Sequence, residues 1–133
     1  MQTKLDILTR HYLIAALWSN TDDNGDPLDA HYDLADIHPD SIARASATCA
    51  AFLADAGDLL EQLPDTYGPH PHCGTVHPQI AAAGHDLWLT SNGHGAGFWD
   101  RGLGELGDKL THLAHAVGGC DAYIGDDARV HLS

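Results

Sequence analysis

Residues 85–100 read HDLWLTSNGHGAGFWD, and this stretch decides the fold that the sequence predicts. HDLWLTS alternates apolar and polar residues with the period of a strand, and an asparagine-glycine pair at 92–93 is a strong turn signal. GAGFWD can then return as a second strand. We therefore expect an antiparallel hairpin with Trp88, Phe98 and Trp99 packing across it.

Helical patterns lie on both sides of this stretch. Apolar residues spaced by three and four predict helices over residues 4–19, 41–63 and 103–117. In the first helix the face that should enter the core carries Leu5, Leu8, Tyr12, Ala15 and Trp18. Asp40 or Ser41 can cap the second helix, and Pro64 ends it. At residues 120–132, CDAYI and ARVHL alternate around a turn and predict a terminal hairpin.

The predicted order is helix, helix, hairpin, helix, hairpin. This order indicates one α+β domain over residues 1–133, with three helices packed on a small, mostly antiparallel sheet. Residues 20–40 hold seven aspartates and neither lysine nor arginine, which predicts an irregular solvated loop. Residues 64–84 are rich in proline, glycine and histidine and predict a long connection or an insertion.

The charge of the chain excludes several classes of function. Nineteen acidic and six basic residues give a formal charge of −13 over 133 residues, which argues against direct nucleic-acid binding and against a polybasic membrane anchor. No apolar run approaches the roughly 18 residues needed to cross a bilayer, and the first residues lack the order of a signal peptide. Three widely spaced cysteines indicate reduced thiols. We expect a cytoplasmic protein.

The distribution of this charge suggests a binding surface. Residues 11–100 contain thirteen acidic residues and one basic residue, Arg44. Such a face either keeps the protein soluble or meets the basic surface of a protein partner. A partner that itself binds nucleic acid would have such a basic surface. The candidate partner-binding residues are Asp22, Asp23, Asp26 and Asp29 in the acidic loop, and Asn92, His94, Phe98, Trp99 and Asp100 at the predicted hairpin.

Two motifs resemble metal sites in part. The side chains of Asn20, Asp22, Asn24 and Asp26, with Gly25 at the sixth position, match the opening of a calcium loop. Position twelve is His31 where a bidentate glutamate is needed, so a plain acidic turn is the favoured interpretation. His70, His72, Cys73 and His77 are ligand types that zinc prefers, but they lie close together, whereas structural zinc sites join separated pairs.

A small metal-binding protein or metal-dependent enzyme is the alternative function. If the hairpin closes in the expected register, His94 approaches His85, Asp86 and Asp100. A histidine beside carboxylates can transfer protons or hold a metal ion. The favoured prediction stays a binding protein without a cofactor.

Two long segments carry a family resemblance. Residues 85–127, HDLWLTSNGHGAGFWDRGLGELGDKLTHLAHAVGGCDAYIGDD, and residues 15–37, AALWSNTDDNGDPLDAHYDLADI, resemble a family of small proteins encoded by bacteriophages and prophages. The resemblance covers most of the chain, is weakest across residues 64–84, and brings no activity or catalytic residues with it. It implies an accessory protein that binds a host or phage protein in the bacterial cytoplasm, for example an anti-defence or host-takeover inhibitor. The bulky tryptophans leave a homodimer open.

Overall fold

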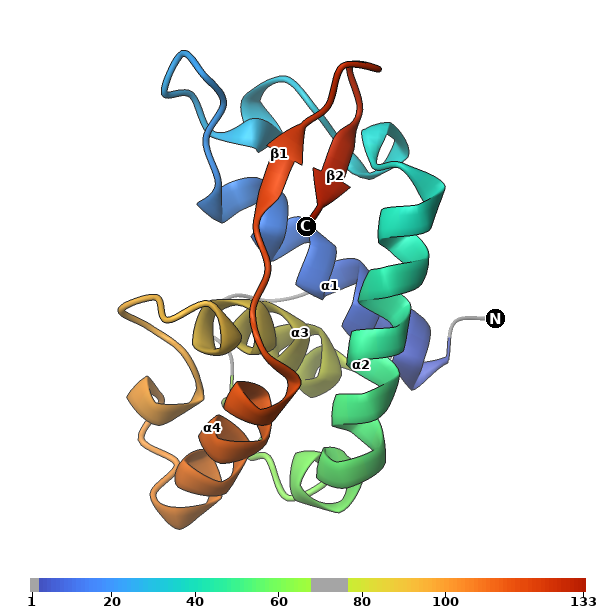
Figure 1. Ribbon diagram of the computed structural model, residues 1–133. Coiled ribbons are helices and arrows are strands. Elements are labelled where there is room, and N and C mark those ends of the chain that lie inside the picture. Colours follow the sequence, from blue (N-terminus) through green and yellow to red (C-terminus); the bar gives the residue numbers. More distant parts are fainter. Residues whose placement is uncertain (1–2, 68–76) are drawn as a thin grey trace.

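The structure, a computed structural model, describes residues 3–67 and 77–133 and is α+β in the broad sense, with helices dominating it. Figure 1 shows helix α3 between α1 and α4, with α2 along their side and a small hairpin at one end. The elements are α1 (Lys4–Ser19), η1 (Leu28–Ala30), η2 (Leu34–Asp36), α2 (Pro39–Leu60), α3 (Pro78–Ser91), η3 (Phe98–Asp100), α4 (Glu105–Val117), β1 (Ala122–Ile124) and β2 (Val130–Leu132). The short η elements are 3-10 helices.

The hairpin predicted at residues 85–100 is wrong. Residues 85–91 are the second half of α3, and residues 98–100 form η3, so the turn at 92–93 follows a helix. Between residues 80 and 90 only His85 is not buried, and the helix therefore lacks the one-sided apolar stripe that marks a surface helix. The sequence-based prediction places the alanines at 81–83 in a connection. Residues 85–91, taken alone, then alternate like a strand, which explains the error.

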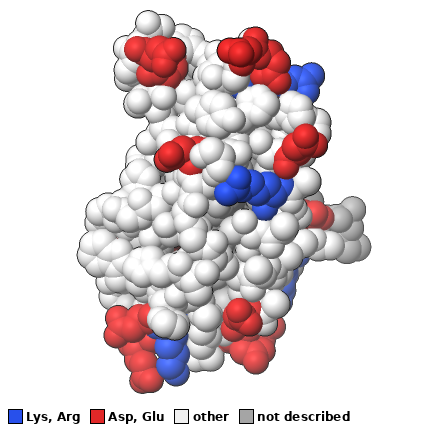
Figure 2. All heavy atoms as spheres, viewed as in Figure 1, with Lys and Arg blue, Asp and Glu red and all other residues white. Residues whose placement is uncertain are grey.

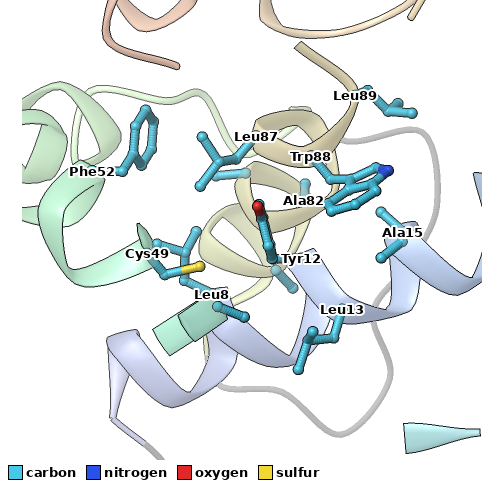
Figure 3. Packing of buried hydrophobic residues seen from close by; sticks show 14 of the residues in the cluster. Leu8, Tyr12, Leu13, Ala15, Cys49, Phe52, Ala82, Leu87, Trp88 and Leu89 are labelled. Atoms are coloured by element: carbon cyan, nitrogen blue, oxygen red, sulfur yellow. The ribbon is translucent and has the colours of Figure 1, made fainter. Parts of the chain in front are cut away.

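The core forms between helices, and α1 and α3 make its most extensive contact. They approach so closely that a Cβ atom at Gly84 would lie 2.5 Å from the backbone oxygen of Leu8. The rings of Tyr12 and Trp88 meet edge to face at 5.1 Å, and Figure 3 shows both among the buried side chains of these helices. Trp88 Nε1 donates a hydrogen bond of 2.6 Å to Ser19 Oγ. Each large apolar side chain buried here stabilises the fold by about 1.5–3 kcal/mol.

The helices predicted near residues 4–19, 41–63 and 103–117 exist as α1, α2 and α4, with differences at their ends. Thr3 caps α1 in a reciprocal pair with Asp6. The cap predicted for α2 at Asp40 or Ser41 is instead His38, whose Nδ1 accepts from the backbone N–H of Asp40. Trp18, predicted to enter the core, is 55% exposed: it lies in the last turn of α1, and its ring rests on the partly buried His85 of α3 at 5.5 Å.

The connection predicted over residues 64–84 is shorter than expected. α3 begins at Pro78, the first helical position, where a proline loses no helix hydrogen bond. Residues 78–84 therefore belong to a helix. The zinc ligands predicted at His70, His72 and Cys73 lie outside the described residues, whereas His77 is the half-buried N-cap residue of α3.

The terminal hairpin is confirmed, with Tyr123 opposite His131 in antiparallel register. The three-helix layer predicted over a larger sheet is wrong, because two strands of three residues cannot cover a helical core and pack at its end instead. β2 is attached to the start of α2. Val130 O accepts from the His38 backbone N–H at 2.9 Å, and the Leu132 N–H donates to the buried Ser41 Oγ at 2.9 Å.

Candidate partner-binding surface

The acidic segment, residues 20–40, is an ordered structure anchored at two points. Leu28 is fully buried and its backbone N–H donates to Asn20 O, while Ile37 is buried near the start of α2. Between these anchors the chain forms η1 and η2. The irregular solvated loop predicted from composition is therefore correct in its exposure, but its backbone is held at both ends by the core.

The first part of this segment is a tight turn built around Asp22. Asp22 Oδ1 accepts from the backbone N–H groups of Asn24 at 2.9 Å and Asp26 at 3.1 Å, and Gly25 adopts the positive φ that the turn requires. Farther along, Asp33 Oδ1 accepts from the Ala35 N–H at 2.9 Å. These carboxylates are therefore held in defined positions by the hydrogen bonds of their own turns.

Among the described residues, the aspartates of the acidic segment have histidines but no lysine or arginine as ion-pair partners. Within residues 3–67 and 77–133, none of the ion pairs joins one of them to a lysine or arginine. Asp26 is 3.3 Å from His31, and Asp40 is 3.8 Å from His38. Figure 2 shows red acidic side chains at the end of the molecule that carries the turn of residues 21–27 and the β1–β2 turn, where they outnumber the blue basic ones, and further red groups at the opposite end. This end therefore has a negative potential that reaches about 10 Å into solution at 0.1 M salt.

An aromatic residue outside the predicted partner site lies beside these carboxylates. Tyr123, on β1, is 47% exposed and lines a cavity of about 260 Å³ together with residues 21–24. Its ring stacks on His131 at 5.6 Å, and His131 stacks on His38 at 5.0 Å. Strand alternation could have identified it, because Tyr123 faces the side opposite to the buried Ala122.

The β1–β2 turn adds a further ordered carboxylate. Asp127 Oδ1 lies 2.9 Å from His131 Nε2 and also accepts from the Arg129 N–H at 3.0 Å. The hydrogen bond from His131 is the main cause that lowers the pKa of the Asp127 carboxyl. This group therefore remains charged at mildly acidic pH.

Residues 20–31, which match the opening of a calcium loop and are favoured as a plain acidic turn, bring only some of the loop's ligands together. The structure brings one ligand atom each of Asp22, Asp26 and His31 within 4.8 Å of one another. Asn20 instead closes the end of α1, with its Nδ2 donating to Ala16 O at 2.8 Å. Exposed acidic groups of this kind are common on protein surfaces without an ion.

The other half of the predicted partner site is dispersed. Phe98 is fully buried and stacks on Phe52 at 5.8 Å, so it offers no surface. Asn92 links the end of α3 to the Cys120 backbone N–H through its Oδ1. His94 is half-buried in the loop after α3, and only Trp99 and Asp100 are exposed.

The predicted acid–base group around residues 85–100 is also separated. Asp86 is 2% exposed and receives two hydrogen bonds from Arg101 and one from Tyr67. Burial, and then the neighbouring Asp86 charge, raise the pKa of the Tyr67 hydroxyl, which stays protonated. His85 packs its ring against Trp18 at 5.5 Å. The Asp86 carboxylate is thus occupied by structural partners.

An open groove lies between α1 and the acidic segment. Its volume is about 470 Å³, within the range of protein sites that bind small ligands or side chains. Apolar residues of α1 and η2 line it together with Tyr32, and charged residues line it as well. Among the described residues, no helix is both long and apolar enough to cross a membrane.

Comparison of the chain with protein-family models, curated proteins and solved structures finds no match. Its function is therefore inferred from its own geometry.

Proposed function

We propose that this chain is a non-enzymatic binding protein that docks on a basic surface of a protein partner through its acidic segment. The observation that carries the proposal is the set of seven aspartates on an anchored backbone, none of which pairs with a lysine or arginine in the part of the chain that the structure describes. A chain with a formal charge of −13 repels nucleic acid and attracts proteins that bind it.

The physical advantage of the arrangement is in the rate and in the entropy of association. Complementary charge accelerates encounter and makes the rate sensitive to salt. Because Asp22 and Asp33 already accept hydrogen bonds from their own turns, ordering these side chains on binding costs little. The exposed ring of Tyr123 adds apolar area next to the carboxylates, and tyrosine is enriched in such interfaces.

The biological setting of the proposal follows from the family resemblance. A bacteriophage or prophage protein of this kind acts in the cytoplasm of an infected or lysogenic bacterium, on a host or phage protein. Inhibition of a nucleic-acid-binding defence or host protein is the most concrete form. A homodimer with the same acidic surface is compatible with it.

The test compares two triple variants that remove the same charge from different places. Asp22→Asn/Asp26→Asn/Asp29→Asn neutralises the acidic segment and keeps the side-chain oxygens that accept turn hydrogen bonds. Asp55→Asn/Asp58→Asn/Asp108→Asn neutralises three exposed carboxylates on α2 and α4. Proteins captured from a bacterial lysate at 50 mM and 500 mM salt are identified, purified and measured for association rate.

The proposal predicts that the first triple variant lowers the association rate at least tenfold at low salt. The second should change it less than threefold, and high salt should remove the difference. An equal loss of association rate in both variants would mean that net charge alone matters, and it would contradict binding through a defined surface. The absence of any retained protein at either salt concentration would also end the proposal.

A further inference from the structure

The groove between α1 and the acidic segment has an apolar interior and a charged edge. Ile14, Leu17 and Leu34 line it and are half-buried or buried, whereas Asp29 and Arg10 line it and are exposed. Covering an apolar lining of this kind with an aliphatic side chain removes apolar surface from water, which is favourable. The exposed charges at the edge would attract residues of opposite charge that flank the bound side chain.

The charges at the edge are of both signs and unpaired. Within the described ranges, neither Arg10 nor Asp29 nor Asp33 forms an ion pair with another residue. A ligand that carries a cation toward the two aspartates and an anion toward Arg10 would complement all three. Two carboxylates against one guanidinium leave the edge net negative, which favours the cation.

We propose that this groove receives an aliphatic side chain of the protein partner, flanked by a lysine or arginine that pairs with Asp29 and Asp33 and by an acidic residue that faces Arg10. The inference rests on the proposed function and deepens it. The groove is lined by residues 29–35 of the same acidic segment, so a partner drawn to the aspartates meets it directly. A few buried anchors supply most of the binding energy of a protein interface, while charges at the edge govern rate and orientation.

The first experiment uses short peptides on the complete chain. The probe is the blocked peptide acetyl-Glu-Gly-Leu-Gly-Lys-amide, and the controls replace its leucine by alanine or its lysine by glutamate. Methyl NMR signals of Ile14, Leu17 and Leu34 should shift and saturate at millimolar peptide. Each control peptide should bind at least fivefold more weakly. Shifts confined to other methyl groups, or shifts that follow protein concentration alone, would overturn the proposal, the latter by pointing to a second copy of the chain.

The second experiment fills the groove. Ala35 is exposed and lines it, so Ala35→Phe should place a ring in the opening at little cost to folding, and Ala54→Phe on the exposed side of α2 is the matched control. Ala35→Phe should abolish the methyl shifts, and Ala54→Phe should leave them. Asp29→Asn removes a charge and keeps the size of the side chain, and it should lower the affinity for the peptide threefold or more. Asp55→Asn is its control.

The two proposals fail in different ways. If Ala35→Phe leaves both the peptide shifts and the captured partner unaffected while the aspartate triple variant still loses the partner, the groove is not used and the acidic surface is. If the peptide binds as expected but no partner depends on the aspartates, the groove is a binding site and the proposed function falls.

Discussion

Arg101 holds the buried carboxylate of Asp86 with two hydrogen bonds, Nη2 to Oδ1 at 2.8 Å and Nε to Oδ2 at 3.1 Å. Tyr67 donates to the same Oδ2. The pair joins α3 to the segment that follows η3, and Tyr67 adds the segment after α2. The hydrogen bond to Asp86 raises the pKa of the Arg101 guanidinium, so Arg101 keeps its positive charge in this partly buried position.

Replacing Asp86 by asparagine should lower the free energy of unfolding by about 3–5 kcal/mol, because it leaves a largely buried guanidinium without its counter-charge. Chemical denaturation measures the change. Asp100→Asn, which removes an exposed carboxylate next to Arg101, should change it by less than about 0.5 kcal/mol. Similar values for the two variants would mean that the ion pair does not hold these segments.

Two helix-interior glycines should respond in opposite directions to alanine. Gly84→Ala should destabilise the chain by about 1–3 kcal/mol, since its Cβ would overlap the Leu8 backbone oxygen. Gly57→Ala, in α2, meets nothing within 4 Å and should stabilise it by about 0.4–1 kcal/mol. Thermal unfolding of the two single variants gives the sign directly, and a stabilising Gly84→Ala would contradict the close approach of α1 and α3.

Stability should fall in alkaline solution through Cys49. Burial raises the pKa of the Cys49 thiol from 9.0 to about 12. The unfolded chain ionises this thiol near pH 9 while the folded chain keeps it neutral. Its contribution is therefore complete below pH 9 and is lost as the pH rises from 9 to 12. Cys49→Ala should show a shallower decline over that window than the unsubstituted chain, and parallel declines would refute the assignment.

Removing the Ser41 hydroxyl should loosen the terminal hairpin. Ser41→Ala leaves the buried Leu132 N–H without an acceptor, which costs about 1–3 kcal/mol. Hydrogen exchange at the Leu132 amide should accelerate at least tenfold. Ser46→Ala, on the same helix, is the control and should leave that amide protected. Unchanged exchange in Ser41→Ala would show that β2 is held by other contacts.

Local patterns predicted the parts of the fold that have one exposed side. α2 and α4 have an apolar stripe, and the terminal hairpin alternates around a turn, so their periods are visible in the sequence. α3 is enclosed by α1, α2 and α4 and has no polar face to reveal its period. The error at residues 85–100 and the missing fourth helix both come from that burial.

The candidate surface was predictable in composition and not in geometry. The aspartates at 22, 23, 26 and 29 stand out as acidic residues without basic neighbours. Their anchoring through Leu28, and the proximity of Tyr123 from a strand about a hundred residues away, depend on tertiary packing. The pairing of Asp86 with Arg101 was missed for the same reason, because no local spacing links residues fifteen positions apart across a turn.

The attachment of β2 to the start of α2 has a consequence for synthesis on the ribosome. The Ser41 hydroxyl oxygen accepts a hydrogen bond from the Leu132 N–H, and the ribosome adds Leu132 91 residues after Ser41. Until residues 122–132 have been made, Ile37 and the first turn of α2 lack the contacts that β2 supplies. Contacts of such long sequence separation form late and slowly. We therefore expect docking of the hairpin to be the last folding step at the end of the molecule that carries the aspartates.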